Sequence, residues 1–353
     1  MLKQIAAGLG LALAASAPAF AADEIVFDPD GTGALAGDTG VGFFDWLPGS
    51  AITVGVIPTA TGDFQTFAHG TLVGAGNGIG DPVGFNGLNS SYEITFVAGF
   101  GEGISSVSQG NFSLESDGGD GVGGGNDVYT FEQSITLGDP SGPLTNFFEI
   151  YYDDSIDASS LGGTGYNDGT LIAAGTVASV IGNFTTQFTF IDGNDDGNYD
   201  PGNDTIIGSG NPTGGFALLD SSPNGDNWGG QQSVVGVGST ALTADVTFQN
   251  NDFFKSNISS LTMDLEFNTS NILPFSQTNP AQSYWDGSSQ VGFGSADIGE
   301  INGLSGPDII FQSDANNSFN VEVPEPKTVL LFALGLLLLG ATTRRRQAPQ
   351  MMA

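Results

Sequence analysis

Residues 170–191 read TLIAAGTVASVIGNFTTQFTFI and show the strand pattern that runs through this chain. The stretch is rich in Thr, Val, Ile and Phe, which fit the half-buried surface of a sheet. Gly182 and Asn183 interrupt it, and both residue types favour turns. We therefore predict two strands, Thr170–Val180 and Phe184–Ile191, that form a hairpin around residues 181–183.

Similar segments lie on both sides of this stretch, separated by turns rich in Gly and Asn. No long amphipathic helix pattern occurs before residue 327. Short strands between such turns predict an all-β fold, with an antiparallel β-sandwich or jelly-roll-like body. We expect further strands at residues 25–27, 51–57, 64–73, 92–97, 128–137, 147–152, 205–207, 216–219, 233–237, 244–249, 261–267, 308–311 and 318–323.

The body, residues 22–322, is predicted to be one elaborated sandwich. No fixed-period repeat is present, which argues against a solenoid or a propeller. If the body divides into two subdomains, we expect the boundary near residues 138–146, where Gly, Asp, Pro and Ser cluster.

Charge is distributed very unevenly along the chain. All 39 acidic residues lie between Asp23 and Glu325, and Lys255 is the only one of the 6 Lys and Arg residues in that region, which therefore has a net charge of about −38. Nucleic acid is excluded as a partner because phosphate contacts need Lys and Arg. An anionic membrane surface is disfavoured for the same reason, and divalent cations would relieve the self-repulsion.

Composition predicts a folded body despite this charge. The 26 Phe and 7 Tyr residues and the hydrophobic content of 39% differ from the composition of disordered acidic chains. The chain contains no Cys, so no disulfide can stabilise it. We expect packing, together with Ca²⁺, to stabilise the body instead.

The N-terminus has the three parts of a secretory signal peptide. Lys3 supplies the positive charge, residues 5–15 are apolar, and Ala19-Phe20-Ala21 fits an A-x-A cleavage site. We predict that residues 1–21 are removed by cleavage after Ala21 and that the body is exported across the inner membrane.

The C-terminus also has three parts. Val323-Pro324-Glu325-Pro326 resists helix formation at its prolines, an apolar Leu-rich run follows over residues 328–343, and Arg344-Arg345-Arg346 ends it before the tail 347–353. We predict a transmembrane helix over residues 328–343 with the arginines on the cytoplasmic side. A buried core helix is the alternative, because the run is short for a membrane span.

This ending, residues 323–346, resembles the PEP-CTERM sorting signal of Gram-negative bacteria. The resemblance implies that an exosortase recognises Pro324-Glu325-Pro326 and that the chain is transiently anchored in the inner membrane. It further implies that the body is then released or transferred to the cell surface, in bacteria that make exopolysaccharide and form biofilms or flocs.

The strongest candidate site is the acidic loop that follows residue 191. Oxygen-bearing side chains occupy its positions 1, 3, 5, 7 and 9 and Gly occupies position 6, which is the spacing of an EF-hand calcium loop. At position 12 an EF-hand has Glu, whereas this chain has Asn203, which is followed by Asp204. In addition, no helix is predicted on either side of the loop. An Asx-rich turn without an ion is the alternative. We predict Ca²⁺ ligands at Asp192, Asn194, Asp196 and Asp200, together with the backbone carbonyl oxygen of Asn198.

A second acidic loop, rich in Gly, spans residues 117–127. It resembles a single loop of the repeats-in-toxin type, but it has no tandem neighbours with which to build a β-roll. We interpret it as a flexible loop, with ion binding as the alternative.

Residues suited to catalysis are scarce. The chain has no Cys, no G-x-S-x-G motif and a single His, His69, which we interpret as an ordinary strand residue. A zinc site of the usual His and Cys type cannot be assembled. We therefore expect no catalytic site, while a carboxylate pair for glycoside hydrolysis stays open among the many acids.

The tryptophans are candidates for stacking on sugar rings. Trp228 and Trp285 lie in polar, turn-like segments and are our glycan-binding candidates, with buried packing as the alternative. Trp46 lies among Phe and Leu and is predicted to be a core residue.

Our leading hypothesis is an exported matrix or surface protein that associates with exopolysaccharide and is stabilised by Ca²⁺. A secreted glycan-active hydrolase is one alternative. An ice-binding or adhesin module is another, although the chain has no regular array of Thr for an ice-binding surface.

Overall fold

The computed structural model describes residues 24–32, 38–56, 60–110, 112–119, 127–200, 202–209, 217–218, 232–233, 236–268, 281–292 and 308–321. Every regular element in these residues is a strand, which confirms the predicted all-β class. The strands are β1 (Ile25–Phe27), β2 (Thr39–Val41), β3 (Phe43–Val54), β4 (Gly62–Gly76), β5 (Pro82–Val83), β6 (Glu93–Gln109), β7 (Ser113–Ser116), β8 (Asp127–Gly138), β9 (Phe147–Asp153), β10 (Thr170–Asp192), β11 (Thr205–Ser209), β12 (Ala217–Leu218), β13 (Gln232–Ser233), β14 (Gly236–Gln249), β15 (Ile258–Asn268), β16 (Ser283–Trp285), β17 (Gln290–Gly292) and β18 (Asp308–Val321).

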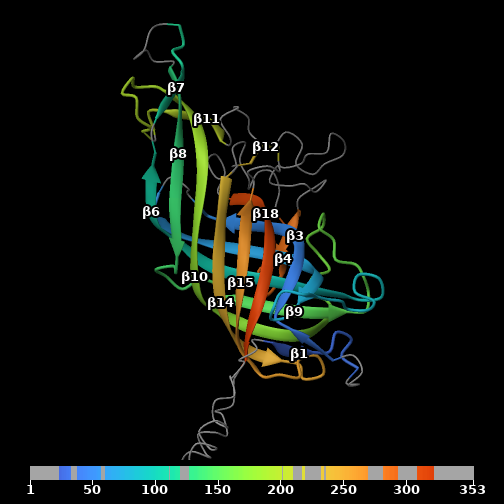
Figure 1. Ribbon diagram of the computed structural model, residues 1–353. Helices are drawn as coiled ribbons and strands as arrows, with labels where there is room; N and C mark the ends of the chain where they lie inside the picture. The colour runs from blue at the N-terminus through green and yellow to red at the C-terminus, as the bar shows by residue number, and fades with distance from the viewer. Residues whose placement is uncertain are drawn as a thin grey trace, which may run out of the picture.

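Most of these strands belong to one large antiparallel sheet that closes on itself (Figure 1). Neighbouring strands run in the order β4, β3, β18, β15, β14, β10, β9, β6, and β6 pairs again with β4. The predicted antiparallel arrangement is therefore confirmed. The prediction of a sandwich or jelly roll is not confirmed, because the pairing continues around the ring and does not divide these strands into two separate sheets.

Strand β10 corrects the predicted hairpin around residues 181–183, because it is a single strand of 23 residues. Gly182 pairs with Leu137 of β8 on one side and with Thr240 of β14 on the other. A Cβ added to Gly182 would lie 2.6 Å from the Ser239 carbonyl oxygen and 2.6 Å from Thr240 Oγ1. The glycine thus permits close approach of a neighbouring strand, which is a second common use of Gly in sheets.

Part of the sheet extends beyond the closed ring. Residues 182–192 of β10 pair with β8, and β7 and β11 pair with the outer sides of β8 and β10. We call β7, β8, β11 and residues 182–192 of β10 the arm; Figure 1 shows it rising above the ring.

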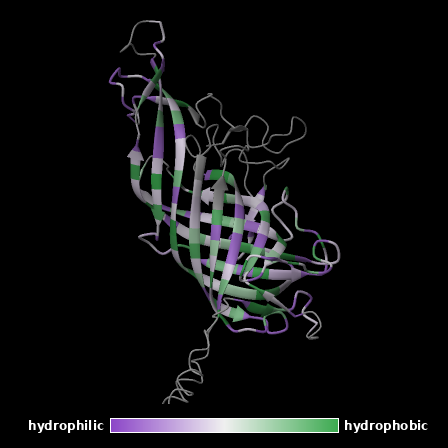
Figure 2. Ribbon diagram, in the orientation of Figure 1, coloured by the Kyte–Doolittle hydropathy of each residue, from purple (hydrophilic) through white to green (hydrophobic). Residues whose placement is uncertain are grey.

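The interior of the closed sheet is filled with aromatic and aliphatic side chains. Trp46, which is fully buried as predicted, lies edge-on to Phe44 and Phe96 at ring-centroid distances of 5.9 and 4.8 Å. Its indole Nε1 donates a hydrogen bond of 2.7 Å to Asn317 Oδ1 of β18. Figure 2 shows the hydrophobic and hydrophilic residues that alternate along these strands, as expected when one face packs inward.

Candidate functional site

The calcium loop predicted at Asp192 begins where β10 ends, at the far end of the arm. Asp192 is the Cα partner of Asp127, the first residue of β8, and both side chains are buried. Asp127 is also the last residue of the second acidic loop predicted from the sequence. The arm therefore brings together two acidic segments that are more than 60 residues apart in the chain.

Asp192 forms the framework of its loop by accepting three backbone hydrogen bonds. Its Oδ1 accepts from the amides of Asn194 and Asp195 at 3.2 and 2.7 Å, and its Oδ2 accepts from the amide of Gly197 at 2.7 Å. Asp195 and Gly197 adopt positive φ angles of 64° and 73°. These bends turn the loop back on itself, and Gly tolerates this conformation without steric cost.

Asn194 lies between two carboxylates of the loop. Its Nδ2 donates to Asp196 Oδ2 at 3.2 Å and to Asp200 Oδ2 at 3.1 Å. Asp196 also accepts the backbone amide of Asn198 at 2.8 Å, and this bond is the main cause that lowers the pKa of Asp196. Both carboxylates thus point toward one shared hydrogen-bond donor.

Asp204 closes the loop, a role that the sequence pattern did not assign to it. Its Oδ1 accepts from the Gly193 amide at 2.9 Å, and its Oδ2 accepts from the Asp200 amide at 2.5 Å. The EF-hand pattern places the closing carboxylate at position 12, which is Asn203 here. The shift of one residue to Asp204 is the signal that could have identified it.

The donor set of this loop fits Ca²⁺, which prefers carboxylate, amide and carbonyl oxygens. Asp196, Asp200 and the side-chain oxygen of Asn194 would hold the ion, since rotation of the Asn194 amide by half a turn exchanges its nitrogen for its oxygen. Asp192 and Asp204, whose oxygens all accept backbone amides, would act as the frame. Asn198 donates its side-chain nitrogen to the Asp196 carbonyl oxygen at 3.0 Å.

A different acidic group was missed by the sequence analysis. Carboxylate oxygens of Asp153, Asp157 and Asp168 lie within 4.8 Å of one another. No other three His, Cys, Asp or Glu side chains in the described ranges have ligand atoms this close together. The pKa of Asp157 is raised, first by the charge of Asp168 and then by burial and by Asp153. Their irregular spacing in the sequence contains no metal-binding pattern, so only the fold could reveal the group.

The second acidic loop is described only at its two ends, Asp117–Gly119 and Asp127. The Gly119 amide donates to Asp117 Oδ1 at 3.0 Å in a local turn. Residues 120–126 lie outside the described part. The interpretation as a flexible loop, with ion binding as the alternative, therefore stays a prediction.

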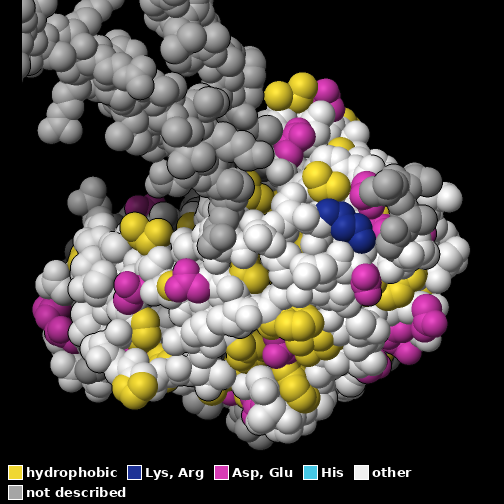
Figure 3. Space-filling view, turned by 90° about the horizontal axis from the view of Figure 1, so that it is seen from below, with side chains coloured by type: hydrophobic (Ala, Val, Ile, Leu, Met, Phe, Trp, Pro, Cys, Tyr) yellow, Lys and Arg dark blue, Asp and Glu magenta, His cyan; other side chains and the backbone are white. Residues whose placement is uncertain are grey.

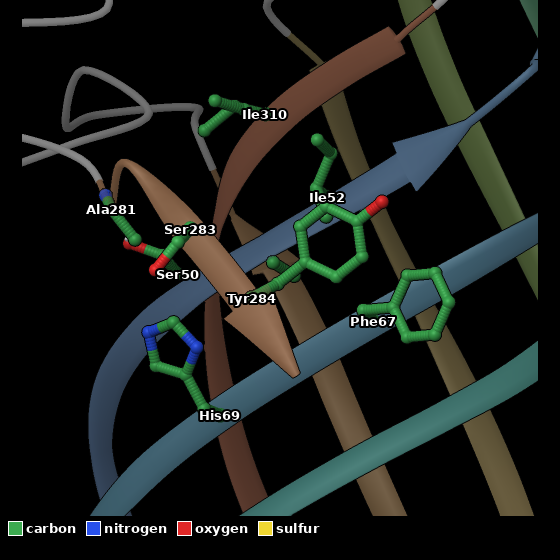
Figure 4. A pocket seen from close by; sticks show the side chains of 9 residues that line it. Ser50, Ile52, Phe67, His69, Ala281, Ser283, Tyr284 and Ile310 are labelled. Atoms are coloured by element: carbon green, nitrogen blue, oxygen red, sulfur yellow. Dashed lines mark hydrogen bonds between the residues drawn. The ribbon is translucent and has the colours of Figure 1, made fainter. Parts of the chain in front are cut away.

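His69 lies in β4, as predicted for a strand residue, and lines a small cavity (Figure 4). The cavity, about 10 Å³ in volume, is otherwise lined by Ser50, Ala51, Ile52, Phe67, Ala281, Ser283, Tyr284 and Ile310. The imidazole is 4% exposed and stacks on Tyr166 at a centroid distance of 4.1 Å. Burial lowers the pKa of His69 to about 4.

The hydroxyl groups of Ser50 and Ser283, which line the cavity with His69, form hydrogen bonds of their own. The Nε2 of His69 is buried and makes no hydrogen bond within the described residues. Ser283 Oγ donates to the Gly162 carbonyl oxygen at 2.5 Å and accepts from Gln290 Nε2 at 2.6 Å, and Ser50 Oγ accepts from the Ala281 amide at 3.3 Å. The cavity has room for about one water molecule.

Of the two glycan-binding candidates, only Trp285 lies in the described residues. It is part of the β16–β17 hairpin, is half-buried, and has its indole Nε1 buried. This orientation leaves only part of the ring available for stacking. Trp228 lies outside the described residues.

Both terminal signals also lie outside the described residues: Ala19 and Ala21 of the cleavage site, and the sorting motif with Val323, Pro324, Glu325, Pro326, Arg344, Arg345 and Arg346. Within the part of the chain that the structure describes, no helix is long and apolar enough to span a membrane.

Comparison with known proteins adds no relative. No protein-family model, no curated protein and no solved structure matches this chain.

Proposed function

We propose that this chain is an exported protein of the extracellular matrix or cell surface that associates with exopolysaccharide. The N-terminal residues 1–21 support export, and the ending over residues 323–346 supports processing by an exosortase after transient anchoring in the inner membrane. The acidic surface supports a partner that is neutral or bridged by cations. Figure 3 shows the underside of the molecule, over which acidic side chains are spread, and Lys255 is the one Lys or Arg among the described residues.

The observation that carries the calcium part of this proposal is the position of the Asn194 amide between Asp196 and Asp200. A cation between these two carboxylates would take the place of the amide group as their shared partner. Ca²⁺ coordinates six to eight oxygens and often keeps some positions open to water. We propose that a hydroxyl or carboxylate of the polymer takes such an open position at the end of the arm.

Co-sedimentation with exopolysaccharide from the producing strain tests this function. The full chain is mixed with the polymer in Ca²⁺ and, in parallel, in a chelator. We expect the protein to sediment with the polymer in Ca²⁺ and to stay in the supernatant when Ca²⁺ is removed. The Asp196→Ala variant should behave in Ca²⁺ as the wild type does in chelator.

Two results would contradict the proposal. Failure of the wild-type protein to sediment in either condition removes the matrix role. A decrease in polymer length during the assay replaces it with the glycan-active hydrolase, and the search for a carboxylate pair then follows.

A further inference from the structure

Glu102 is a buried acid that the proposed function does not use. It lies on β6, on the inward face that also carries Phe96 and Phe100, and it is 2% exposed. Its carboxylate oxygens accept hydrogen bonds from two fully buried threonines. Thr66 Oγ1 donates to Oε2 at 2.5 Å, and Thr240 Oγ1 donates to Oε1 at 3.1 Å.

The two threonines come from opposite sides of the closed sheet. Thr66 lies on β4, which is hydrogen-bonded to β6. Thr240 lies on β14, which is separated from β6 around the ring by β10 and β9. Glu102 therefore spans the interior and connects two walls that are not neighbours in the sheet.

Gly182 makes room for this connection. A Cβ at that position would lie 2.6 Å from Thr240 Oγ1, the atom that donates to Glu102. The residue that the sequence suggested as a turn is thus part of the environment of the buried acid.

No cation is available to neutralise Glu102 among the described residues. Lys255, the one Lys or Arg there, donates to the carbonyl oxygens of Asn251 and Asp252 and lies 3.7 Å from Asp28. A carboxylate buried without a positive partner is costly, so such a group tends to take up a proton.

The other titratable groups on the strands around Glu102 have their own surroundings. Asp63 of β4 is bonded to Ser141, Glu149 of β9 accepts from Tyr151, and His69 lies in its cavity. Glu93 of β6 is also buried; it accepts the amides of Asp157 and Ala158, and burial raises its pKa. The remaining groups on these strands are Asp127, Tyr129 and Glu132 of β8, Tyr151, Tyr152 and Asp153 of β9, Asp192 of β10, Asp245 of β14 and Tyr284 of β16. Burial raises the pKa of Glu102 to about 7, and the two threonine bonds oppose this rise only in part.

We propose that Glu102 is a proton-dependent link between the two walls of the closed sheet. Its neutral carboxyl bridges Thr66 and Thr240 inside the sheet. When it releases its proton to solvent, a negative charge without a counter-ion remains in the interior and weakens the closure. The protein is then most stable in acidic to neutral surroundings and less stable in alkaline ones.

The sign follows from proton linkage. The folded state holds the Glu102 proton up to a higher pH than the unfolded state, so the stabilisation is complete below about pH 4.5 and is lost as the pH rises through about 7. Between pH 5.5 and 8.5, the unfolding equilibrium constant of the wild type should rise by about 30-fold through this group.

The test compares the full chain with its Glu102→Gln variant. Guanidinium unfolding is measured from pH 5.5 to 8.5, and the infrared C=O band of protonated carboxyl groups is titrated over the same range. In the wild type we expect one component of the carboxyl band to disappear near pH 7. In the Glu102→Gln variant we expect this component to be missing, and the 30-fold change in the unfolding equilibrium constant to be lost. The matched control is Glu149→Gln, a half-buried acid on β9, which should keep both signals.

A second variant keeps the test decisive if Glu102→Gln does not fold. Thr240→Val removes a hydrogen bond that favours the charged form, so the infrared midpoint should move to higher pH. The proposal is overturned if the wild type shows no carboxyl titration near pH 7, or if Glu102→Gln retains the wild-type dependence of unfolding on pH.

Discussion

The closed sheet and the arm share strand β10, but they differ in the side chains that they bury. The closed sheet encloses a continuous core that contains Trp46, Phe96 and Phe148. Among the described residues, the cluster toward the end of the arm has Phe131, Phe188 and Phe190 as its buried members. At the end of the arm, hydrogen-bonded carboxylates take the place of further apolar side chains.

The two regions also differ in how they accommodate acidic and basic groups. In the walls of the closed sheet, Glu102 and His69 are buried where the charged form of each is disfavoured. In the arm, Asp196 accepts the backbone amide of Asn198, and this bond lowers the pKa of its carboxyl group. We conclude that the closed sheet depends on apolar packing, and we propose that the arm depends on charge and on a cation that balances it.

The largest expected effect is in the core of the closed sheet. Trp46→Ala removes a fully buried side chain and leaves Asn317 Oδ1 without its indole donor. We expect a loss of about 3–5 kcal/mol in the free energy of unfolding, measured by guanidinium denaturation in chelator. Trp285→Ala, at the half-buried position on the β16–β17 hairpin, should cost clearly less. Equal losses would contradict the dominance of the closed core.

His69 gives the next largest effect and tests the exclusion of charge from the closed sheet. Its folded pKa, about 4, lies below the ordinary value of 6.5, so its contribution is complete above pH 6.5 and is lost as the pH falls toward 4. That difference corresponds to about 3 kcal/mol. His69→Phe should be less destabilised than the wild type between pH 6.5 and 4 in thermal unfolding. If the melting temperatures of the two proteins change in parallel with pH, His69 becomes charged in the folded protein without a loss of stability.

The contrast between packing and charge also marks what the sequence could predict. Segment Phe147–Tyr152 was recognisable as a strand because local composition and alternation are sufficient for that inference, and β9 occupies it. The acidic loop was recognisable because its residues follow one another at fixed spacing. By contrast, Glu102 is 36 residues from Thr66 and 138 from Thr240, and only the closure of the sheet brings the three together.

Calcium should have a smaller, ligand-dependent effect that is confined to the arm. At a Ca²⁺ concentration of 100 times the dissociation constant, binding would add about 2.7 kcal/mol to the stability of the region that unfolds with the loop. We expect Asp196→Ala to abolish the rise in melting temperature that Ca²⁺ causes in the wild type. Asp286→Ala is the matched control, because Asp286 caps a similar turn through Ser288 and Ser289 but lies outside the arm. A rise that survives in Asp196→Ala would place the ion elsewhere, and Asp153, Asp157 and Asp168 would then be replaced next.

The smallest expected effect concerns the strand that joins the two regions. Gly182→Ala would place a Cβ 2.6 Å from the Ser239 carbonyl oxygen, so β14 must move away from β10. Overpacking of this kind costs about 1–3 kcal/mol. The neighbouring Ile181→Thr is the control, because Ile181 is 69% exposed and substitutions at such sites change stability by about 0.5 kcal/mol or less.

If β10 turned at this position, as its sequence suggests, Gly182 would need conformational freedom and Asn183→Gly would be stabilising. In a continuous strand Asn183→Gly is destabilising, because Gly weakens strand interiors. Amide hydrogen exchange in these variants would also show whether the disturbance stays local or reaches Asp192, and transmission to Asp192 would mean that the arm and the closed sheet unfold as one unit.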